Sequence, residues 1–152
     1  RRYGQGLQRL TARQYVEAHD VLAGVAKEAP AFREVAARLA EAENAMRQQA
    51  GVDFKAATKL EESAEWVEAL KAYERLRPYS STLPGLTEAI ERTRKKMADA
   101  GVEALTRARQ YDSRGRVPEA IAWYQRAVSW LPPDHPGLEA AKQRLAQLQN
   151  RP

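Results

Sequence analysis

A repeat of about fifty residues runs through this chain of 152 residues, and it constrains the fold more than any single motif does. Three local matches agree on its period within two residues: Glu17-Ala18 with Glu68-Ala69 and Glu119-Ala120, Ala50-Gly51-Val52 with Ala100-Gly101-Val102, and Pro84-Gly85-Leu86 with Pro136-Gly137-Leu138. Periods of about 20–50 residues are typical of proteins that stack one supersecondary unit, because neighbouring units bury each other's apolar faces. We therefore expect an array of similar units that share one continuous core.

Within each period the pattern of apolar residues is that of α-helices. Apolar side chains recur mostly at three- and four-residue steps over residues 31–62 and 84–112. Prolines are absent from 31–77 and 85–117 and gather where a helix would start or a turn would lie. Glutamates stand four residues before Arg or Lys along the same stretches, and each such pair adds about 0.2–0.5 kcal/mol of helix stability. Since no alternating run of β-branched residues indicates a strand, the fold class is expected to be all-α.

We expect seven helices, at residues 3–12, 15–28, 31–62, 66–77, 84–112, 117–130 and 136–150. The two long ones would each extend about 45 Å at a rise of about 1.5 Å per residue. Gly51 and Gly101 lie inside them, where glycine costs about 1 kcal/mol relative to alanine. Each glycine therefore marks a bend or the close approach of a neighbouring helix, and a full break at both, giving nine helices, is the alternative. The short helices are expected to contribute the core side chains Trp66, Leu70, Tyr73, Ile121, Tyr124 and Val128.

Residues 101–134 carry a recognisable pattern of small residues, aromatics and a terminal proline, formed by Ala104, Ala108, Tyr111, Gly115, Ala120, Tyr124, Ala127 and Pro132. This segment resembles the tetratricopeptide repeat, a helix–turn–helix unit of about 34 residues. Weaker matches place further units around residues 50–83 and at the N-terminus. The resemblance implies an α-solenoid of stacked hairpins in one domain, 1–152, with units at 1–30, 31–83 and 84–134 and a final helix at 136–150. About 17 extra residues per unit lengthen each first helix beyond the pattern of the family, and we expect the chain to be part of a larger protein.

The resemblance implies a non-enzymatic scaffold that binds a protein or peptide partner, or another segment of its parent protein. The family binds its ligands in a groove lined by the first helix of each hairpin. Carried over position by position, the groove residues are Phe54, Thr58, Glu61 and Glu62 in the middle unit, and Leu105, Arg109, Asp112 and Ser113 in the last. The Lys and Asn residues with which the family clamps a C-terminal carboxylate are missing, so no such ligand is implied.

Positive charge is concentrated in residues 92–116, a segment whose net charge equals the +5 of the whole chain. Its first cluster consists of Arg92, Arg94, Lys95 and Lys96. Such a segment can be a solvated helix face paired with local acids, a surface for an acidic partner, or a weak polyanion site. Nucleic acid is the least expected partner, because no recognition helix or interleaved aromatics accompany the charge. A self-assembling module, in which exposed apolar stripes of two copies pair, is a further alternative.

The composition argues against catalysis and against bound cofactors or metals. The chain has no cysteine, and its two histidines, His19 and His135, have no second ligand at a metal-like spacing. No glycine-rich phosphate loop is present. No apolar run approaches the about 20 residues of a membrane span. The excess of arginine and alanine suggests a bacterial source, and a chain without cysteine fits the cytoplasm and the periplasm equally well.

Two tryptophans, Trp123 and Trp130, are separated by seven residues and share one side of the expected helix 117–130. They can pack against the core or against a neighbouring unit. Alternatively they can anchor a partner, because tryptophan is enriched in binding hot spots.

Overall fold

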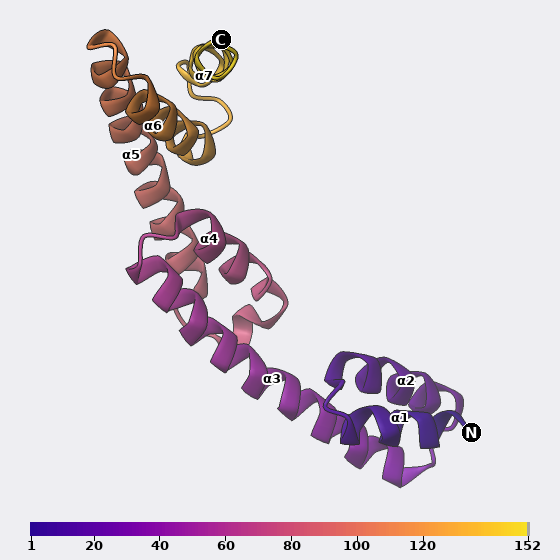
Figure 1. Cartoon of the computed structure of the whole chain (residues 1–152). Helices are drawn as coiled ribbons and strands as arrows, with labels where there is room; N and C mark the ends of the chain where they lie inside the picture. Colours follow the sequence, from indigo (N-terminus) through magenta and orange to yellow (C-terminus); the bar gives the residue numbers. More distant parts are fainter. Residues whose placement is uncertain (152) are drawn as a thin grey trace.

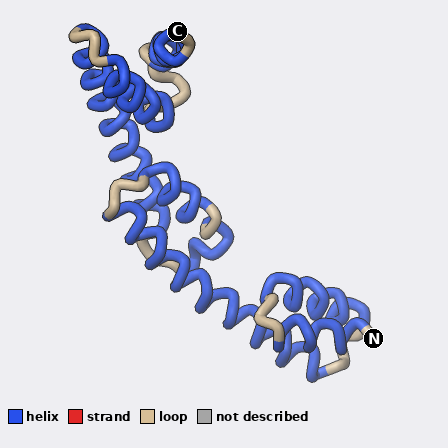
Figure 2. The backbone as a smooth tube through the Cα atoms, viewed as in Figure 1, coloured by secondary structure: helices blue, strands red, loops and turns tan. Residues whose placement is uncertain are grey.

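The computed structural model describes residues 1–151 and consists of helices joined by short turns (Figure 2). The α-helices are α1 (Arg2–Thr11), α2 (Tyr15–Glu28), α3 (Arg33–Glu62), α4 (Trp66–Glu74), α5 (Leu86–Ser113), α6 (Val117–Trp130) and α7 (Leu138–Gln149), and a 3₁₀ helix, η1 (Arg77–Thr82), lies between α4 and α5. No strand occurs in the described residues. The prediction of an all-α fold is confirmed.

The helix bounds agree with the sequence expectation within two residues, with the starts at Arg33, Leu86 and Leu138 instead of 31, 84 and 136, except at the end of one helix. The expected helix 66–77 is wrong at its end, because α4 stops at Glu74 and a separate 3₁₀ helix follows. Pro78 explains this, since the residue before a proline is disfavoured in the α conformation and proline suits only the first turn of a helix. The long helices α3 and α5 both run without a break, so the alternative of nine α-helices is wrong.

Each long helix is shared by two consecutive groups of three helices (Figure 1). The first group comprises α1, α2 and the N-terminal half of α3. The second comprises the remainder of α3 with α4 and the first half of α5, and the third comprises the remainder of α5 with α6 and α7. The groups follow one another along an elongated molecule, with the two termini at opposite ends (Figure 1). Neighbouring groups are therefore joined by continuous helix instead of a loop.

The turn inside each hairpin repeats with the same backbone geometry every 51 residues. Its central residue has a positive φ in all three copies: 59° at Arg13, 58° at Ala64 and 72° at Gly115. The next residue donates its backbone N–H to the carbonyl oxygen five residues earlier, at 2.9 Å from Gln14 and at 3.0 Å from Glu65 and Arg116. The structural period is thus 51 residues for these turns.

Buried small residues occupy equivalent positions on either side of these turns, namely Gly6, Ala57 and Ala108 before the turn and Ala18, Ala69 and Ala120 after it. Small side chains allow the two helices of a hairpin to approach closely.

Of the six side chains expected to form the core, Tyr73 and Tyr124 are buried, and the other four are half-buried.

The two glycines inside the long helices are not structurally equivalent, although both stand in an Ala-Gly-Val sequence. The period of 51 residues aligns Gly101 with Ala50, and both are buried. A Cβ atom on Gly101 would lie 2.8 Å from the backbone N of Leu131 and 2.9 Å from the carbonyl carbon of Trp130. On Gly51 such an atom would have no described atom within 4 Å. The close approach of the end of α6 therefore explains the glycine at position 101, whereas no such contact explains the glycine at position 51.

Candidate functional site

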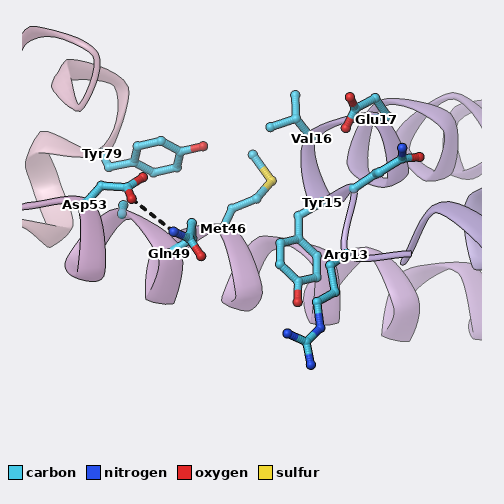
Figure 3. A pocket seen from close by; sticks show the side chains of 10 residues that line it. Arg13, Tyr15, Val16, Glu17, Met46, Gln49, Asp53 and Tyr79 are labelled. Atoms are coloured by element: carbon cyan, nitrogen blue, oxygen red, sulfur yellow. Dashed lines mark hydrogen bonds between the residues drawn. The ribbon is translucent and has the colours of Figure 1, made fainter. Parts of the chain in front are cut away.

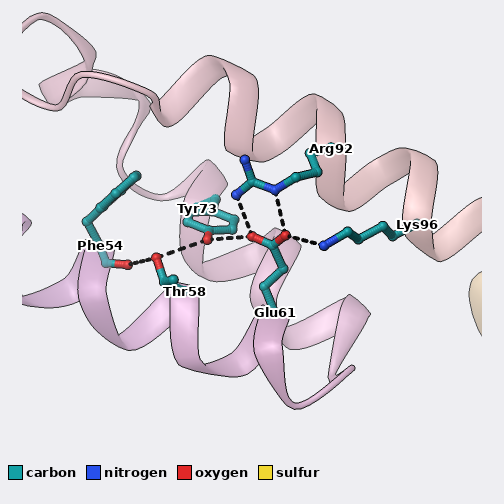
Figure 4. Close-up of polar contacts among 6 residues, drawn as sticks. All are labelled: Phe54, Thr58, Glu61, Tyr73, Arg92 and Lys96. Carbon is teal, nitrogen blue, oxygen red and sulfur yellow. Dashed lines mark hydrogen bonds and ion pairs between the residues drawn. The ribbon is translucent and has the colours of Figure 1, made fainter.

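Glu61, near the end of α3, is a nearly buried carboxylate with 5% of its surface exposed. Arg92 of α5 donates to it from Nε and Nη2, each at 2.7 Å, and Lys96 donates from Nζ at 3.0 Å (Figure 4). The Tyr73 hydroxyl of α4 donates to the same carboxylate at 2.9 Å. The hydrogen bonds from Arg92 contribute most to holding the pKa of Glu61 at about 2, below its ordinary 4.5. This carboxylate therefore ties together the three helices of the second group.

A similar cluster recurs in the third group around Asp112. Arg144 of α7 donates to this carboxylate from Nε at 2.7 Å and from Nη2 at 2.8 Å, and the Tyr124 hydroxyl lies 3.2 Å from Oδ2. Arg144 is the main cause that lowers the pKa of Asp112. The acid, the tyrosine and the arginine follow their counterparts in the second group by 51, 51 and 52 residues. We call each set an acid–tyrosine–arginine cluster.

In the first group, Leu10 and Leu22 stand where the clusters have the acid and the tyrosine. Leu22 is fully buried. The repeated clusters are thus a feature of the second and third groups. No sequence motif indicated them, since the carboxylate and its arginine are 31 or 32 residues apart.

The eight residues expected to line a groove lie in different environments. Glu61 and Leu105 are buried, Phe54, Thr58 and Asp112 are half-buried, and Glu62, Arg109 and Ser113 are exposed. The ring of Phe54 packs against that of Tyr73, with centroids 5.6 Å apart. Both clustered carboxylates, Glu61 and Asp112, are bonded within the chain, so a partner could reach them only by disturbing internal contacts.

The four basic residues of the expected patch are largely engaged with acids of the same chain. Arg92 and Lys96 bind Glu61, and Arg94 forms an ion pair with Glu74 of α4. Lys95 is exposed. This arrangement matches the interpretation of the segment as a helix face paired with local acids, and it leaves less positive charge for a polyanion.

Trp123 and Trp130 are half-buried and pack against the core of the third group. The guanidinium groups of Arg107 and Arg126 lie 4.8 Å and 4.4 Å from the centre of a Trp123 ring. These contacts favour the packing role for both tryptophans.

A groove lies over the middle of α3, between α2 and η1, and sequence reasoning did not find it. Its main hollow has a volume of about 400 Å³ and is lined by Tyr15 and Val16 of α2, Met46 and Ala50 of α3, and Tyr79 of η1. Met46 points up between Tyr79 on one side and Val16 on the other (Figure 3). An adjoining hollow of about 280 Å³ shares Met46 and Tyr79. We call the two hollows together the α3 groove. Its existence depends on the distance between α2 and η1, which no local pattern specifies.

Polar groups surround this apolar floor. Asp53 accepts a hydrogen bond from Nε2 of Gln49 at 3.0 Å, and Glu17 lines the same hollow from the side of α2. Among the side chains that the structure describes, neither carboxylate forms an ion pair. Glu43, at the adjoining hollow, lies 3.7 Å from His19 Nε2 and 4.0 Å from Arg47 Nη2. The main hollow thus combines apolar side chains with two carboxylates that form no ion pair among the described side chains, and Arg13 also lines it.

Residues 1–151 contain no group of three or more His, Asp and Glu side chains placed to hold a metal ion. In the same part of the chain, none of the helices combines the length and the apolar character needed to span a membrane.

A scan against models of protein families, a search of curated proteins and a search of solved structures each found no match.

Proposed function

We propose that this protein is a non-enzymatic interaction scaffold that binds a protein partner at the α3 groove. The observation that carries the proposal is the set of apolar side chains left accessible around one hollow between two packed helix groups. Val16 is 54% exposed, and Tyr15, Met46 and Tyr79 are only half-buried although they line the same concave surface. Exposed apolar patches with a rim of polar groups mark protein–protein interaction sites or ligand-binding grooves.

The repeated helical hairpins support the same class of function. The sequence resemblance of residues 101–134 to the tetratricopeptide repeat supports partner binding, and stacked helical units offer extended surfaces. The acid–tyrosine–arginine clusters are less suitable as the binding site. Their carboxylates are bonded to arginines of the same chain, and a partner would have to break those bonds first.

Affinity capture with the tagged chain, followed by mass spectrometry, tests the proposal. Capture by the wild-type chain is compared with capture by a variant that carries a charged side chain in the groove. Val16→Glu should abolish capture of the specific partner, because it introduces a carboxylate beside an apolar floor and two other acids. Val52→Glu is the matched control, since Val52 is also an exposed helical valine, at 60% exposure, and does not line the groove.

Equal capture by both variants would contradict the proposal. Light scattering on the same proteins decides the alternative of self-assembly. A dimer that dissociates only in Val16→Glu would identify the α3 groove as an interface between two copies.

A further inference from the structure

The two junctions between helix groups can be aligned residue by residue, but several of the aligned side chains differ. We call the region between the start of α2 and η1, over α3, the first interval. The region between the start of α4 and the end of α6, over α5, is the second interval. At a spacing of 51 residues, the first and second intervals pair Tyr15 with Trp66, Val16 with Val67, Met46 with Met97, Gln49 with Ala100, Asp53 with Ala104 and Tyr79 with Trp130.

The second interval is closed by the chain itself. Helix α4 contacts helix α6, and the end of α6 lies against the backbone of α5 at Gly101. Val67 is half-buried there, whereas its counterpart Val16 is 54% exposed. At the 51-residue spacing, Trp66 of α4 and Trp130 of α6 align with the smaller phenols of Tyr15 and Tyr79. The Trp66 ring lies 6.0 Å from Nζ of Lys96 on α5, and Trp130 packs against the core of the third group.

Compared with the second interval, the first interval therefore has smaller aromatic side chains and more polar side chains. Alanines at positions 100 and 104 are replaced by Gln49 and Asp53, which face the groove next to Tyr79 (Figure 3). Glu17 lies on the opposite side, near Val16, and the side chain of Arg13 is directed away from Met46 (Figure 3). An unpaired carboxylate beside an apolar hollow favours a ligand that supplies a cation together with an apolar group.

Resting on the proposed function, we propose that the α3 groove takes a partner segment that inserts one large aromatic side chain above Met46. The same segment presents a lysine or arginine beside it. The aromatic group supplies the volume that the tryptophans supply in the second interval. The cation pairs with Asp53 or Glu17, the two carboxylates of the hollow that form no ion pair among the described side chains.

A random peptide library displayed on phage and selected on the full chain tests this chemistry. A grafted variant gives the first interval the side chains of the second, by Tyr15→Trp, Gln49→Ala, Asp53→Ala and Tyr79→Trp. Peptides that also bind this variant recognise another surface, and they are removed before selection on the full chain. The expected enrichment is an aromatic residue next to Lys or Arg. Enrichment of acidic peptides, of peptides without an aromatic residue, or of none at all would overturn the proposal.

Affinities of one enriched peptide, measured by fluorescence anisotropy, give the quantitative test. The grafted variant and Val16→Glu should each weaken binding by about tenfold or more, equivalent to about 1.4 kcal/mol, and Val52→Glu should leave it unchanged. The double variant Glu17→Gln and Asp53→Asn should reduce the preference for the basic peptide over its Lys→Ala analogue, and an unchanged preference would refute the role given to the two carboxylates. Circular dichroism confirms that each variant retains its helices.

The two proposals can fail separately. If partner capture depends on Val16 but the enriched peptides show no basic residue, the groove binds a partner of different chemistry, and only this inference is wrong. If neither capture nor peptide binding responds to Val16→Glu, the proposed function is wrong as well. Tight binding by the grafted variant would also refute the inference, because it would show that the open volume is not what the ligand fills.

Discussion

Replacing Gly51 and Gly101 with alanine should change the stability of this protein in opposite directions, although both glycines lie inside long helices in the same Ala-Gly-Val sequence. Alanine is more favourable than glycine in a helix interior by about 1 kcal/mol, because glycine loses more backbone freedom on folding. At Gly51 the added methyl group meets no described atom within 4 Å. Gly51→Ala should therefore raise the free energy of unfolding by about 1 kcal/mol.

At Gly101 the same gain is outweighed by a steric conflict. The new Cβ atom would lie 2.8 Å from the backbone N of Leu131, whereas ordinary van der Waals contact begins at 3.4 Å. Backbone atoms cannot rotate out of the way as a flexible side chain can, so the end of α6 must move. Overpacking costs about 1–3 kcal/mol, and a clash with backbone atoms belongs to the upper part of that range, about 2–3 kcal/mol. After the helix gain of about 1 kcal/mol, the net effect of Gly101→Ala should be a loss of about 1–2 kcal/mol.

Urea denaturation followed by far-UV circular dichroism measures both free energies, with Gly24→Ala as a control. Gly24 lies in α2 and also has open space around its Cβ position, so its substitution should be stabilising, as at Gly51. The argument is refuted if Gly101→Ala stabilises the protein, or if both long-helix variants shift the midpoint in the same direction.

Two further predictions concern the acid–tyrosine–arginine clusters. Glu61→Gln should lower the free energy of unfolding by about 2–3 kcal/mol at about pH 7, whereas its exposed neighbour Glu62→Gln should change it by less than about 0.5 kcal/mol. The pKa of Glu61 is about 2 in the folded protein, and its ordinary value is 4.5. The ionised carboxylate therefore stabilises the fold fully above a pH of 4.5, and this stabilisation is lost as the pH falls through about 2. Urea titrations should therefore show the difference between wild type and Glu61→Gln shrinking toward zero at about pH 2, and a constant difference would contradict the assignment. Arg144→Ala should cost about 1 kcal/mol, less than Glu61→Gln, because Arg144 is 35% exposed. Hydrogen exchange should become faster in α7 and stay unchanged in α1 and α2.

Local sequence signals specified most of the helices, and the reasons for the exceptions are physical. The apolar period and the flanking turns located residues 15–28 and 117–130 at the bounds that the structure has. The end of α4 differs from the expected bound because Pro78 disfavours the α conformation of the preceding residue, although the apolar pattern continues in helical steps. A backbone restriction also explains why α5 starts later than expected. Gly85 has a φ of 87°, which is incompatible with a helical position.

Tertiary contacts were the part that local patterns could not provide. Glu61 stands among other glutamates near a helix end and has the sequence context of a solvated residue. Its burial depends on Arg92, which lies 31 residues further along the chain. The α3 groove is similarly non-local, since its main hollow is lined by Tyr15 of α2, Met46 of α3 and Tyr79 of η1. Comparison of the repeat copies residue by residue would have indicated from the sequence that its aromatic residues differ from those of the second interval.

The continuous course of α3 and α5 has a mechanical consequence. A pulling force applied along the long axis would pass from one helix group to the next through the backbone of a single helix. A hinge loop would yield at low force, whereas stretching these segments requires breaking successive backbone hydrogen bonds inside a helix of 30 or 28 residues. Two ligands held on different groups would also keep a fixed separation and a fixed rotation about the axis. The molecule would therefore act as a rigid spacer between whatever is attached at its two ends.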